Sequence, residues 1–345
     1  MRKRILSGVQ PSGKLHLGNY FGAIRQHIAL QDEGECFYFI ADYHALTTLA
    51  DIQPEAKLRK KTLADHVHQV ALDYLALGLD PDKAAFFRQS DVPEVTELAW
   101  FFSTVTGMGL LERAHSYKDK IDRGIASSVG LFTYPVLMAA DILIYRSHVV
   151  PVGKDQVQHL EMTRDMAGYF NNAFGVDIFP LPVERLDKAA TVPGIDGKKM
   201  SKSYGNTIEI FAEGNPLKKT VMSIVTDSTS VESPKDPSRC NVVALYHLFA
   251  SESEQGKIES LYRNPLEDAD QRQGRPFGYG DSKKMLLEKI NAFFGPFREK
   301  RKQLANNPEY VEDVLRRGAA KARAEARKTM EMVRAAVGML PRPVV

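Results

Sequence analysis

Residues 5–19, ILSGVQPSGKLHLGN, decide the predicted fold, because an apolar strand runs directly into a glycine-punctuated turn. Ile5–Val9 is predicted to be a short buried strand, and Gly18 then begins a helix. A helix N-terminus offers free backbone N–H groups, and its dipole favours negative charge. Gly18 has no Cβ where a nucleotide would approach the backbone. The stretch therefore predicts a phosphate-binding turn.

The same strand–helix alternation continues through the first half of the chain. Further strands are predicted where apolar runs are bounded by turns, at 36–41, 84–87 and 148–152. Helical periodicity is found at 18–30, 54–77, 155–170 and 309–337. The pattern predicts an α/β fold with a Rossmann-like catalytic domain at 1–205, interrupted by a helical insertion at about 107–147. An all-helical domain is predicted at 206–345, where the strand signal fades.

A second phosphate-handling segment lies about 180 residues after the first. Gly194–Asn206 contains Lys199-Met200-Ser201-Lys202-Ser203, a basic loop flanked by glycines. Ammonium groups on a mobile loop suit the stabilisation of a pyrophosphate leaving group. His16 and Asn19 of the first segment can donate to phosphate oxygens. Alone, either segment could be an ordinary turn or a solvated basic loop, but together they predict a site for ATP.

Other nucleotide-binding classes are disfavoured by motifs that the sequence lacks. Neither G-x-G-x-x-G nor G-x-x-x-x-G-K-[ST] occurs, so an NAD enzyme and a P-loop NTPase are both disfavoured. No apolar run is long enough to cross a membrane, and the N-terminus does not resemble a signal peptide. With only Cys36 and Cys240, a disulfide is not expected, and the cytoplasm is the predicted compartment.

Charge gives a weaker indication of a partner. The net charge is only +3, and basic residues are in excess in the last 48 residues. This bias is compatible with a nucleic-acid partner, although a solvated basic helix face would produce the same pattern.

Two segments carry a resemblance to a known family. PSGKLHLGN (11–19) resembles the first signature of the class I aminoacyl-tRNA synthetases, and KMSKS (199–203) matches the second. The likeness covers nearly the whole chain and is closest to the bacterial tryptophanyl-tRNA synthetases, through residues 111–120, 131–145 and 150–167. The resemblance implies activation of L-tryptophan by ATP·Mg²⁺ and transfer to tRNA(Trp). It also implies a homodimer with the helical insertion at the interface, and an anticodon-binding role for 206–345.

The resemblance assigns residues to three sets. The implied catalytic residues are His16, Asn19, Lys118, Lys199 and Lys202. The implied ATP-binding residues are Gln10, Pro11, Ser12, Gly18, Asn19, Gly153, Lys154, Asp155, Val192, Lys199, Met200, Ser201, Lys202 and Ser203. The implied tryptophan-binding residues are Leu6, Gly8, Gln10, His44, Tyr134, Met138, Asp141, Val150, Val152 and Gln156.

The role of Asp141 can also be argued from chemistry. An indole has one polar atom, an N–H that only donates, so a buried carboxylate is its matching acceptor. An acceptor left unpaired by phenylalanine would reject that amino acid strongly. The alternative for Asp141 is a helix residue paired with Arg146. For His44, a packed core histidine is as plausible as a pocket residue.

The chain departs from some relatives that carry four cysteines in the C-terminal domain. Cys240 matches the first of these, but Gly278–Ser282 contains no C-x-x-C. One thiol cannot hold an iron–sulfur cluster, so no such cluster and no protein-bound metal are expected.

Two other functions remain open from the sequence. A tyrosyl-tRNA synthetase is the alternative enzyme, because a phenol also donates a hydrogen bond and Asp141 alone does not exclude it. A non-catalytic paralogue, acting as a tryptophan sensor or a tRNA-binding module, is the alternative from another class. The presence of Gly18, Lys118, Lys199 and Lys202 argues against such a paralogue.

Overall fold

The computed structural model describes residues 2–114, 117, 128–186 and 191–339. Its contacts divide the chain into two compact units. Unit 1 comprises Met1–Gly13, Gln26–Asp187 and Leu304–Val345, and unit 2 comprises Lys14–Arg25 and Lys188–Gln303. The first signature therefore crosses from unit 1 to unit 2 at Gly13, and the KMSKS loop belongs to unit 2.

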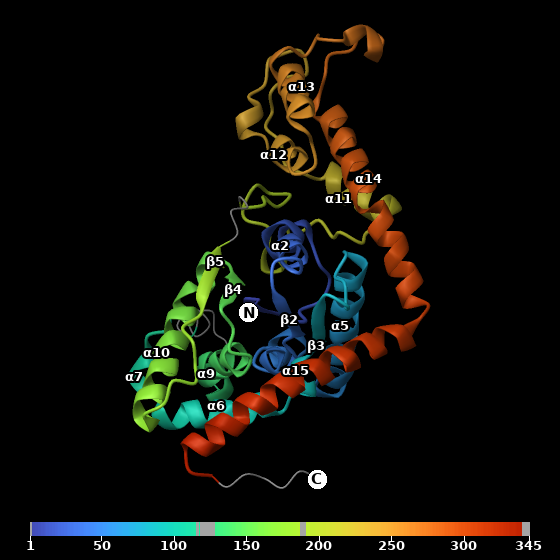
Figure 1. Ribbon diagram of the computed structural model, residues 1–345. Coiled ribbons are helices and arrows are strands. Elements are labelled where there is room, and N and C mark those ends of the chain that lie inside the picture. Colours follow the sequence, from blue (N-terminus) through green and yellow to red (C-terminus); the bar gives the residue numbers. More distant parts are fainter. Residues whose placement is uncertain (1, 115–116, 118–127, 187–190, 340–345) are drawn as a thin grey trace. The chain divides into compact units, whose positions relative to one another are not determined.

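Unit 1 is built on a five-stranded parallel sheet in the order β3-β2-β1-β4-β5 (Figure 1). The strands are β1 (Arg4–Val9), β2 (Glu35–Ile40), β3 (Ala84–Arg88), β4 (Val149–Val152) and β5 (Val183–Leu186). The α/β fold and the first four strands are confirmed. The strand order reverses at β1, which lies between β2 and β4, so the crevice at the carboxyl ends of these strands is where ligands bind in such folds.

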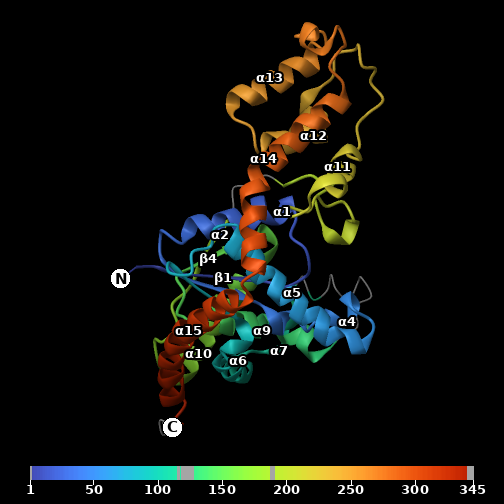
Figure 2. The ribbon, with the colours of Figure 1, turned by 90° about the vertical axis from the view of Figure 1, so that its right-hand side faces the viewer.

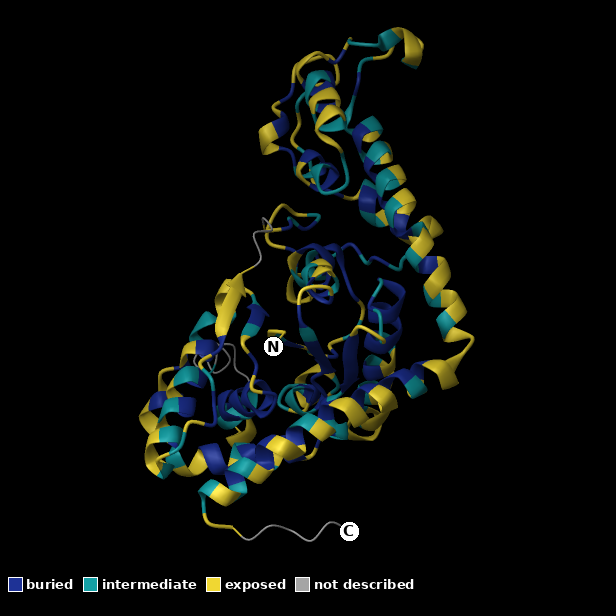
Figure 3. Cartoon of the chain, in the orientation of Figure 1, coloured by how far each residue is buried: buried dark blue, intermediate teal, exposed yellow. Residues whose placement is uncertain are grey.

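The sequence analysis missed β5, and its burial explains why. All four of its residues are exposed, whereas β2 and β3 are almost wholly buried (Figure 3). An exposed edge strand carries no continuous apolar run, so the pattern that identified the inner strands is absent.

Helices cover the sheet of unit 1. They are α2 (Arg25–Leu30, which begins in unit 2), α3 (Asp42–Ala45), α4 (Leu49–Ile52), α5 (Ala56–Ala76), α6 (Glu94–Val105), α7 (Met108–Glu112), α9 (Val129–Ile144), α10 (Val157–Phe174) and α15 (Pro308–Ala336). Helices α6, α9 and α10 pack against one another and share one hydrophobic cluster with the sheet. None of the helices in the described part of the chain is long and apolar enough to cross a membrane.

The last helix, α15, packs along the edge strand β3 and also touches α6, α9 and α5. The contacts therefore group residues 304–345 with the sheet, whereas the sequence placed them with the second domain. The physical reason is the apolar stripe of α15, whose buried members Val314, Ala322 and Met330 need a partner surface. The predicted division of function at residue 205 stays a prediction.

We expect Gly318→Ala to destabilise unit 1 by about 2–3 kcal/mol, because overpacked cores cost that much. A Cβ at Gly318 of α15 would lie 2.0 Å from the carbonyl oxygen of Phe86, and backbone on both sides cannot move away easily. Gly168→Ala in α10 is the matched control, since its Cβ would meet nothing within 4 Å. Urea titration should show a lower midpoint for Gly318→Ala only. Equal midpoints would contradict the packing described for α15.

Unit 2 contains short segments of the two signatures and a group of helices (Figure 2). Its elements are α1 (Leu17–Asn19), the π-helical η1 (Tyr20–Ile24), α11 (Gly214–Met222), α12 (Asn241–His247), α13 (Glu252–Arg263) and α14 (Tyr279–Ala305, which continues into unit 1). Aromatic rings fill its core, with the centroid of Tyr20 5.2 Å from that of Phe294 and the centroid of Phe21 5.2 Å from that of Phe249.

Both cysteines are buried and free. The Cys240 sulfur lies 3.3 Å from the hydroxyl of Tyr262, which donates to Ser282 at 2.8 Å. Ser282 belongs to the stretch where some relatives carry C-x-x-C, so hydrogen-bonded packing occupies this place here. The absence of an iron–sulfur cluster stays a prediction.

Candidate active site

The polar centre of the unit 1 site is Asp141, which α9 buries to 2% exposure. Its Oδ2 lies 2.8 Å from Nε2 of His44. Its two oxygens accept hydrogen bonds from Nε2 of Gln89 at 2.8 and 2.9 Å. Burial raises the pKa of the Asp141 carboxyl, while the hydrogen bonds from His44 and Gln89 oppose that rise. No ion pair joins Asp141 to Arg146 in the described structure, so the alternative role is not what the structure contains.

Gln89 is a site residue that the sequence analysis missed. It follows β3 directly, in the 3-10 turn η2 (Gln89–Asp91), and is 2% exposed. Its Oε1 accepts the backbone N–H groups of Tyr43 and His44 at 3.1 and 3.4 Å. Since those two groups can only donate, they fix the amide so that its N–H₂ faces Asp141. A polar residue at the carboxyl end of a buried strand was the available signal.

The predicted apolar walls of the pocket belong to the hydrophobic core of unit 1 or pack against it. One hydrophobic cluster contains Leu6 of β1, Val150 and Val152 of β4, and Met138 of α9. Gly8 lies two residues after Leu6 on the same face of β1. A Cβ at Gly8 would come within 2.5 Å of the Phe39 ring, so only glycine leaves this surface open. The assignment of these residues as walls of an indole pocket stays a prediction.

Two aromatic residues complete the polar edge of the pocket. The Tyr134 hydroxyl lies 2.7 Å from Nε2 of His159, and the Tyr134 ring packs edge-on against His44 with centroids 6.2 Å apart. His44 therefore contacts both Asp141 and Tyr134, and its role as a tryptophan-binding residue stays a prediction.

The remaining unit 1 candidates lie just beyond the carboxyl ends of β1 and β4, the neighbouring strands at the reversal of strand order. Gln10, Pro11 and Ser12 follow β1, and Nε2 of Gln10 donates to the carbonyl of His44 at 3.2 Å. The segment 153–155 follows β4 and enters the 3-10 turn η3 (Lys154–Gln156), where Gln156 donates to Asp155 at 2.9 Å.

In unit 2, the first signature forms a compact turn that pairs with residues 208–210. The Leu17 N–H donates to the Ile208 carbonyl at 3.0 Å, and the His16 N–H donates to Oδ1 of Asn19 at 3.0 Å. The Gly18 N–H lies 3.4 Å from the sulfur of Met200, and a Cβ on Gly18 would come within 3.4 Å of the Cβ of Met200. The two signatures are therefore in direct contact within this unit.

The KMSKS loop is anchored by a second residue that was missed, Asn206, which is almost fully buried. Its amide N–H₂ donates to Asp196 at 2.7 Å and to the Lys199 carbonyl at 3.1 Å, and its oxygen accepts the Ser201 N–H at 2.8 Å. The Met200 N–H donates to the carbonyl of Val192 at 2.9 Å. These bonds hold the loop backbone, while the side chains of Lys199, Lys202 and Ser203 stay at the surface.

Lys202 places a positive charge close enough to act on the buried His16 in this unit. His16 is buried, and burial together with the positive charge of Lys202 lowers its pKa to about 4. At neutral pH the imidazole is therefore uncharged and can donate one hydrogen bond. Its buried Nδ1 has no hydrogen-bond partner among the described residues. Lys118, which is also among the predicted catalytic residues, lies outside the residues that the structure describes. Where the structure is described, no three His, Cys, Asp or Glu side chains gather to hold a metal ion.

Comparison with known proteins identifies the family. The model for "tRNA synthetases class I (W and Y)" matches residues 2–295. The tryptophan–tRNA ligase of Fusobacterium nucleatum is 53% identical over 339 residues, covering 98% of both chains. That of Rhodopirellula baltica is 50% identical over 97% of this chain and 99% of its own.

A solved structure agrees with these sequence relatives. The tryptophanyl-tRNA synthetase of Campylobacter jejuni, complexed with ADP and tryptophan, superposes with a TM-score of 0.88 at 46% identity. The match covers 97% of this chain and all of that one. The chain therefore belongs to the class I tRNA synthetases for tryptophan and tyrosine, and within them to the tryptophan–tRNA ligases.

Proposed function

We propose that this chain selects L-tryptophan through the Asp141 pocket, activates it with ATP and transfers it to tRNA(Trp). The observation that carries the proposal is the buried carboxylate of Asp141, held by Gln89 and His44 among apolar walls. Oε1 of the Gln89 amide accepts two backbone N–H groups, and its Nε2 donates to the carboxylate of Asp141. Asp141 keeps acceptor capacity for one further donor, which the indole N–H supplies.

The chemistry proceeds in two steps. A carboxylate oxygen of tryptophan attacks the α-phosphorus of ATP, the bond to the β-phosphate oxygen breaks, and pyrophosphate leaves. A hydroxyl at the 3′ end of the tRNA then attacks the carbonyl carbon, and AMP leaves. In the first step Lys199 and Lys202 would stabilise charge on the leaving pyrophosphate, together with donors from His16 and Asn19. Lys118 is proposed as a further ammonium group at the triphosphate.

The adenosine and amino-acid backbone positions complete the proposal. Gln10, Tyr134 and Gln156 would hold the α-amino and carboxylate groups of tryptophan, and segment 153–155 would lie under the adenosine. Mg²⁺ favours oxygen ligands and often uses substrate phosphates, so ATP itself would bring the ion.

A homodimer is also proposed, through the helical insertion. Large apolar side chains are exposed on three neighbouring helices: Trp100 on α6 at 68%, Met108 on α7 at 62% and Val129 on α9 at 79%. Met108 and Val129 belong to the insertion and Trp100 to the helix before it, and large exposed apolar side chains of this kind are suited to a protein interface. A cytoplasmic location and an anticodon-binding role for the helical domain are further parts of the proposal.

Gln89→Met should raise the KM for tryptophan about tenfold, because a hydrogen bond to a charged group is lost. The KM for ATP should not change. Gln31→Met is the control, since Gln31 is also a buried amide in unit 1 and lies outside the Asp141 pocket.

Gln89→Glu provides a pH-dependent readout for the same role. At neutral pH it sets a second carboxylate against Asp141 and should weaken tryptophan binding more than Gln89→Met does. Lowering the pH should partly restore binding, because the introduced carboxyl can donate as the amide did once it is protonated. An unchanged tryptophan KM in both variants would contradict the role given to Gln89.

Charging of tRNA tests the whole proposal. The purified chain should attach tryptophan to tRNA(Trp) and leave tRNA(Tyr) uncharged with tyrosine. Charging with tyrosine would favour the tyrosyl alternative. Tryptophan binding without adenylate formation or charging would favour the sensor alternative.

A further inference from the structure

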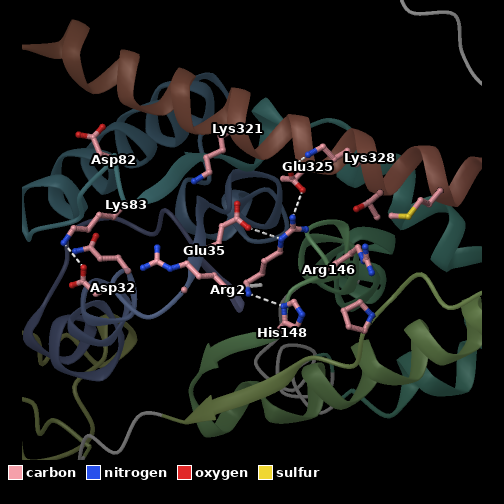
Figure 4. Close-up of a pocket in the computed structure, with 16 residues that line it drawn as sticks. Arg2, Asp32, Glu35, Asp82, Lys83, Arg146, His148, Lys321, Glu325 and Lys328 are labelled. Atoms are coloured by element: carbon pink, nitrogen blue, oxygen red, sulfur yellow. Dashed lines mark hydrogen bonds and ion pairs between the residues drawn. The ribbon is translucent and has the colours of Figure 1, made fainter.

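A large cavity in unit 1 lies at the opposite edge of the sheet from the Asp141 pocket (Figure 4). Its volume is about 950 Å³, within the range of small-molecule sites. It is lined by residues at the amino ends of β1 and β2, by residues just before β3 and β4, and by one face of α15. Since parallel strands place all their amino ends at one edge, this cavity is separate from the proposed catalytic site.

The acidic side chains of the cavity are all paired. Arg4 bonds both Glu35 at 3.1 Å and Glu325 at 2.6 Å. Lys83 pairs with Asp32 at 2.7 Å. The remaining acidic side chain, Asp82, lies 3.5 Å from Arg317 of α15. Glu325 also pairs with Lys328 at 2.5 Å, so each carboxylate of the lining has a basic partner within the protein.

Three cations of the lining are not balanced in this way. Arg2, Arg146 and Lys321 make no side-chain hydrogen bond or ion pair with any residue that the structure describes. They come from three segments: the start of the chain before β1, the turn after α9, and α15. Figure 4 shows Lys321 extending from α15 into the space, with Arg146 beside His148 on the β4 side.

The directions in which the pKa values of two neighbouring groups are shifted indicate a positive field at this cavity. Burial lowers the pKa of His148, and the charges of Arg4 and Arg146 lower it further. Burial raises the pKa of Cys36 at the start of β2, and Lys321 and Arg2 both oppose that rise. The unpaired charges thus act on groups at the amino ends of two strands of the sheet.

We propose that this cavity binds a small polyphosphate anion. Unpaired cations from three separate segments of one cavity suit a ligand with several negative charges, and phosphate oxygens accept from both guanidinium and ammonium groups. The described lining contains no Phe, Tyr or Trp, and its unpaired cations are suited to the phosphate chain of the ligand. Bound there, the anion would tie α15 to the end of α9 and the start of β1, and so strengthen the packing of α15 on the sheet.

Arg146 allows a test that does not disturb the fold. Its φ is 51°, a left-handed conformation that glycine adopts freely, so Arg146→Gly removes the charge without straining the backbone. Lys321→Gln removes the unpaired ammonium that α15 contributes to the cavity. Arg316→Gln is the matched control, because Arg316 lies on the same helix outside this cavity.

Calorimetric titration with inorganic tripolyphosphate provides the measurement, at low and at physiological ionic strength. Lys199→Ala with Lys202→Ala serves as the background, so that binding at the catalytic loop is weakened. We expect one binding event in this background, weakened at least about tenfold by Arg146→Gly with Lys321→Gln and unchanged by Arg316→Gln. ATP and GTP in parallel should bind no more tightly than tripolyphosphate.

Tripolyphosphate binding is measured without tryptophan activation. A chain that failed to activate tryptophan would therefore leave the test of the cavity unaffected. Pyrophosphate exchange should be normal when Arg146→Gly and Lys321→Gln are made in the wild-type chain. Equal isotherms with and without the cavity substitutions would overturn the proposal. The absence of tripolyphosphate binding in the variant that lacks Lys199 and Lys202 would also overturn it. So would tRNA binding that is tighter than tripolyphosphate binding and depends on Arg146 and Lys321.

Discussion

Asp141→Asn should lower kcat/KM for tryptophan activation on the order of 10²- to 10³-fold, from the loss of a charged acceptor and a mispaired buried amide. Nε2 of Gln89 lies within 2.9 Å of both carboxylate oxygens of Asp141. An asparagine N–H₂ placed at either oxygen position therefore faces a donor. At the Oδ2 position it would also face His44. No rotamer of the amide restores the pattern, although the side chain has nearly the same shape.

A substrate analogue separates this recognition from simple loss of folding. In 3-benzothienylalanine a sulfur replaces the indole N–H, so it cannot donate to Asp141. Wild-type protein should discriminate strongly against it, because a buried acceptor would be left unpaired. Asp141→Asn should lose most of that discrimination. If the variant keeps the wild-type preference for tryptophan over the analogue, Asp141 does not recognise the N–H.

Lys202→Ala should lower kcat for activation on the order of 10²- to 10³-fold, as removal of a single charge-stabilising group does in other enzymes. Its charge already acts on the buried His16 in unit 2, where it helps to lower the pKa of that imidazole to about 4. If Lys202 acts on the leaving pyrophosphate, the dissociation constant for tryptophan should change less than about twofold, or about 0.4 kcal/mol.

The control for this variant lies in the same loop. Lys198 is exposed and precedes the signature, so Lys198→Ala changes the loop charge equally without removing a proposed catalytic group. Stopped-flow measurement of adenylate formation should leave Lys198→Ala close to wild type. Equal losses in kcat and tryptophan affinity for Lys202→Ala would mean that it acts in binding, and a matching defect in Lys198→Ala would mean that only loop charge matters.

Much of the fold followed from local patterns. The continuous apolar run of β2 and the strand-to-helix turn after β1 each reflect burial between helices, which sequence records directly. The exposed strand β5 has no apolar run that would identify it. It pairs with β4, which lies more than thirty positions earlier in the chain. The stripe of α15 predicted a helix, but not that Gly318 would seat it on β3.

In the candidate site, too, some residues could be predicted from the sequence and others depend on partners that only folding brings near. Asp141 could be singled out because an indole needs an acceptor and because the surrounding residues resemble a known family. Gln89 carries no motif, and its partner Asp141 lies 52 positions away, so only the folded chain connects them. Asn206 likewise acts through backbone groups of the loop that it anchors, which no side-chain pattern records.

Tryptophan-dependent exchange of radiolabelled pyrophosphate into ATP, with tyrosine as the control, tests the central claim most directly. It requires the Asp141 pocket of unit 1 and the lysines of unit 2 to act in one reaction. We expect exchange with tryptophan only, lowered on the order of 10²- to 10³-fold by Asp141→Asn and by Lys202→Ala. Exchange with tyrosine, or tryptophan-dependent exchange that survives both substitutions, would contradict the assignment of these residues.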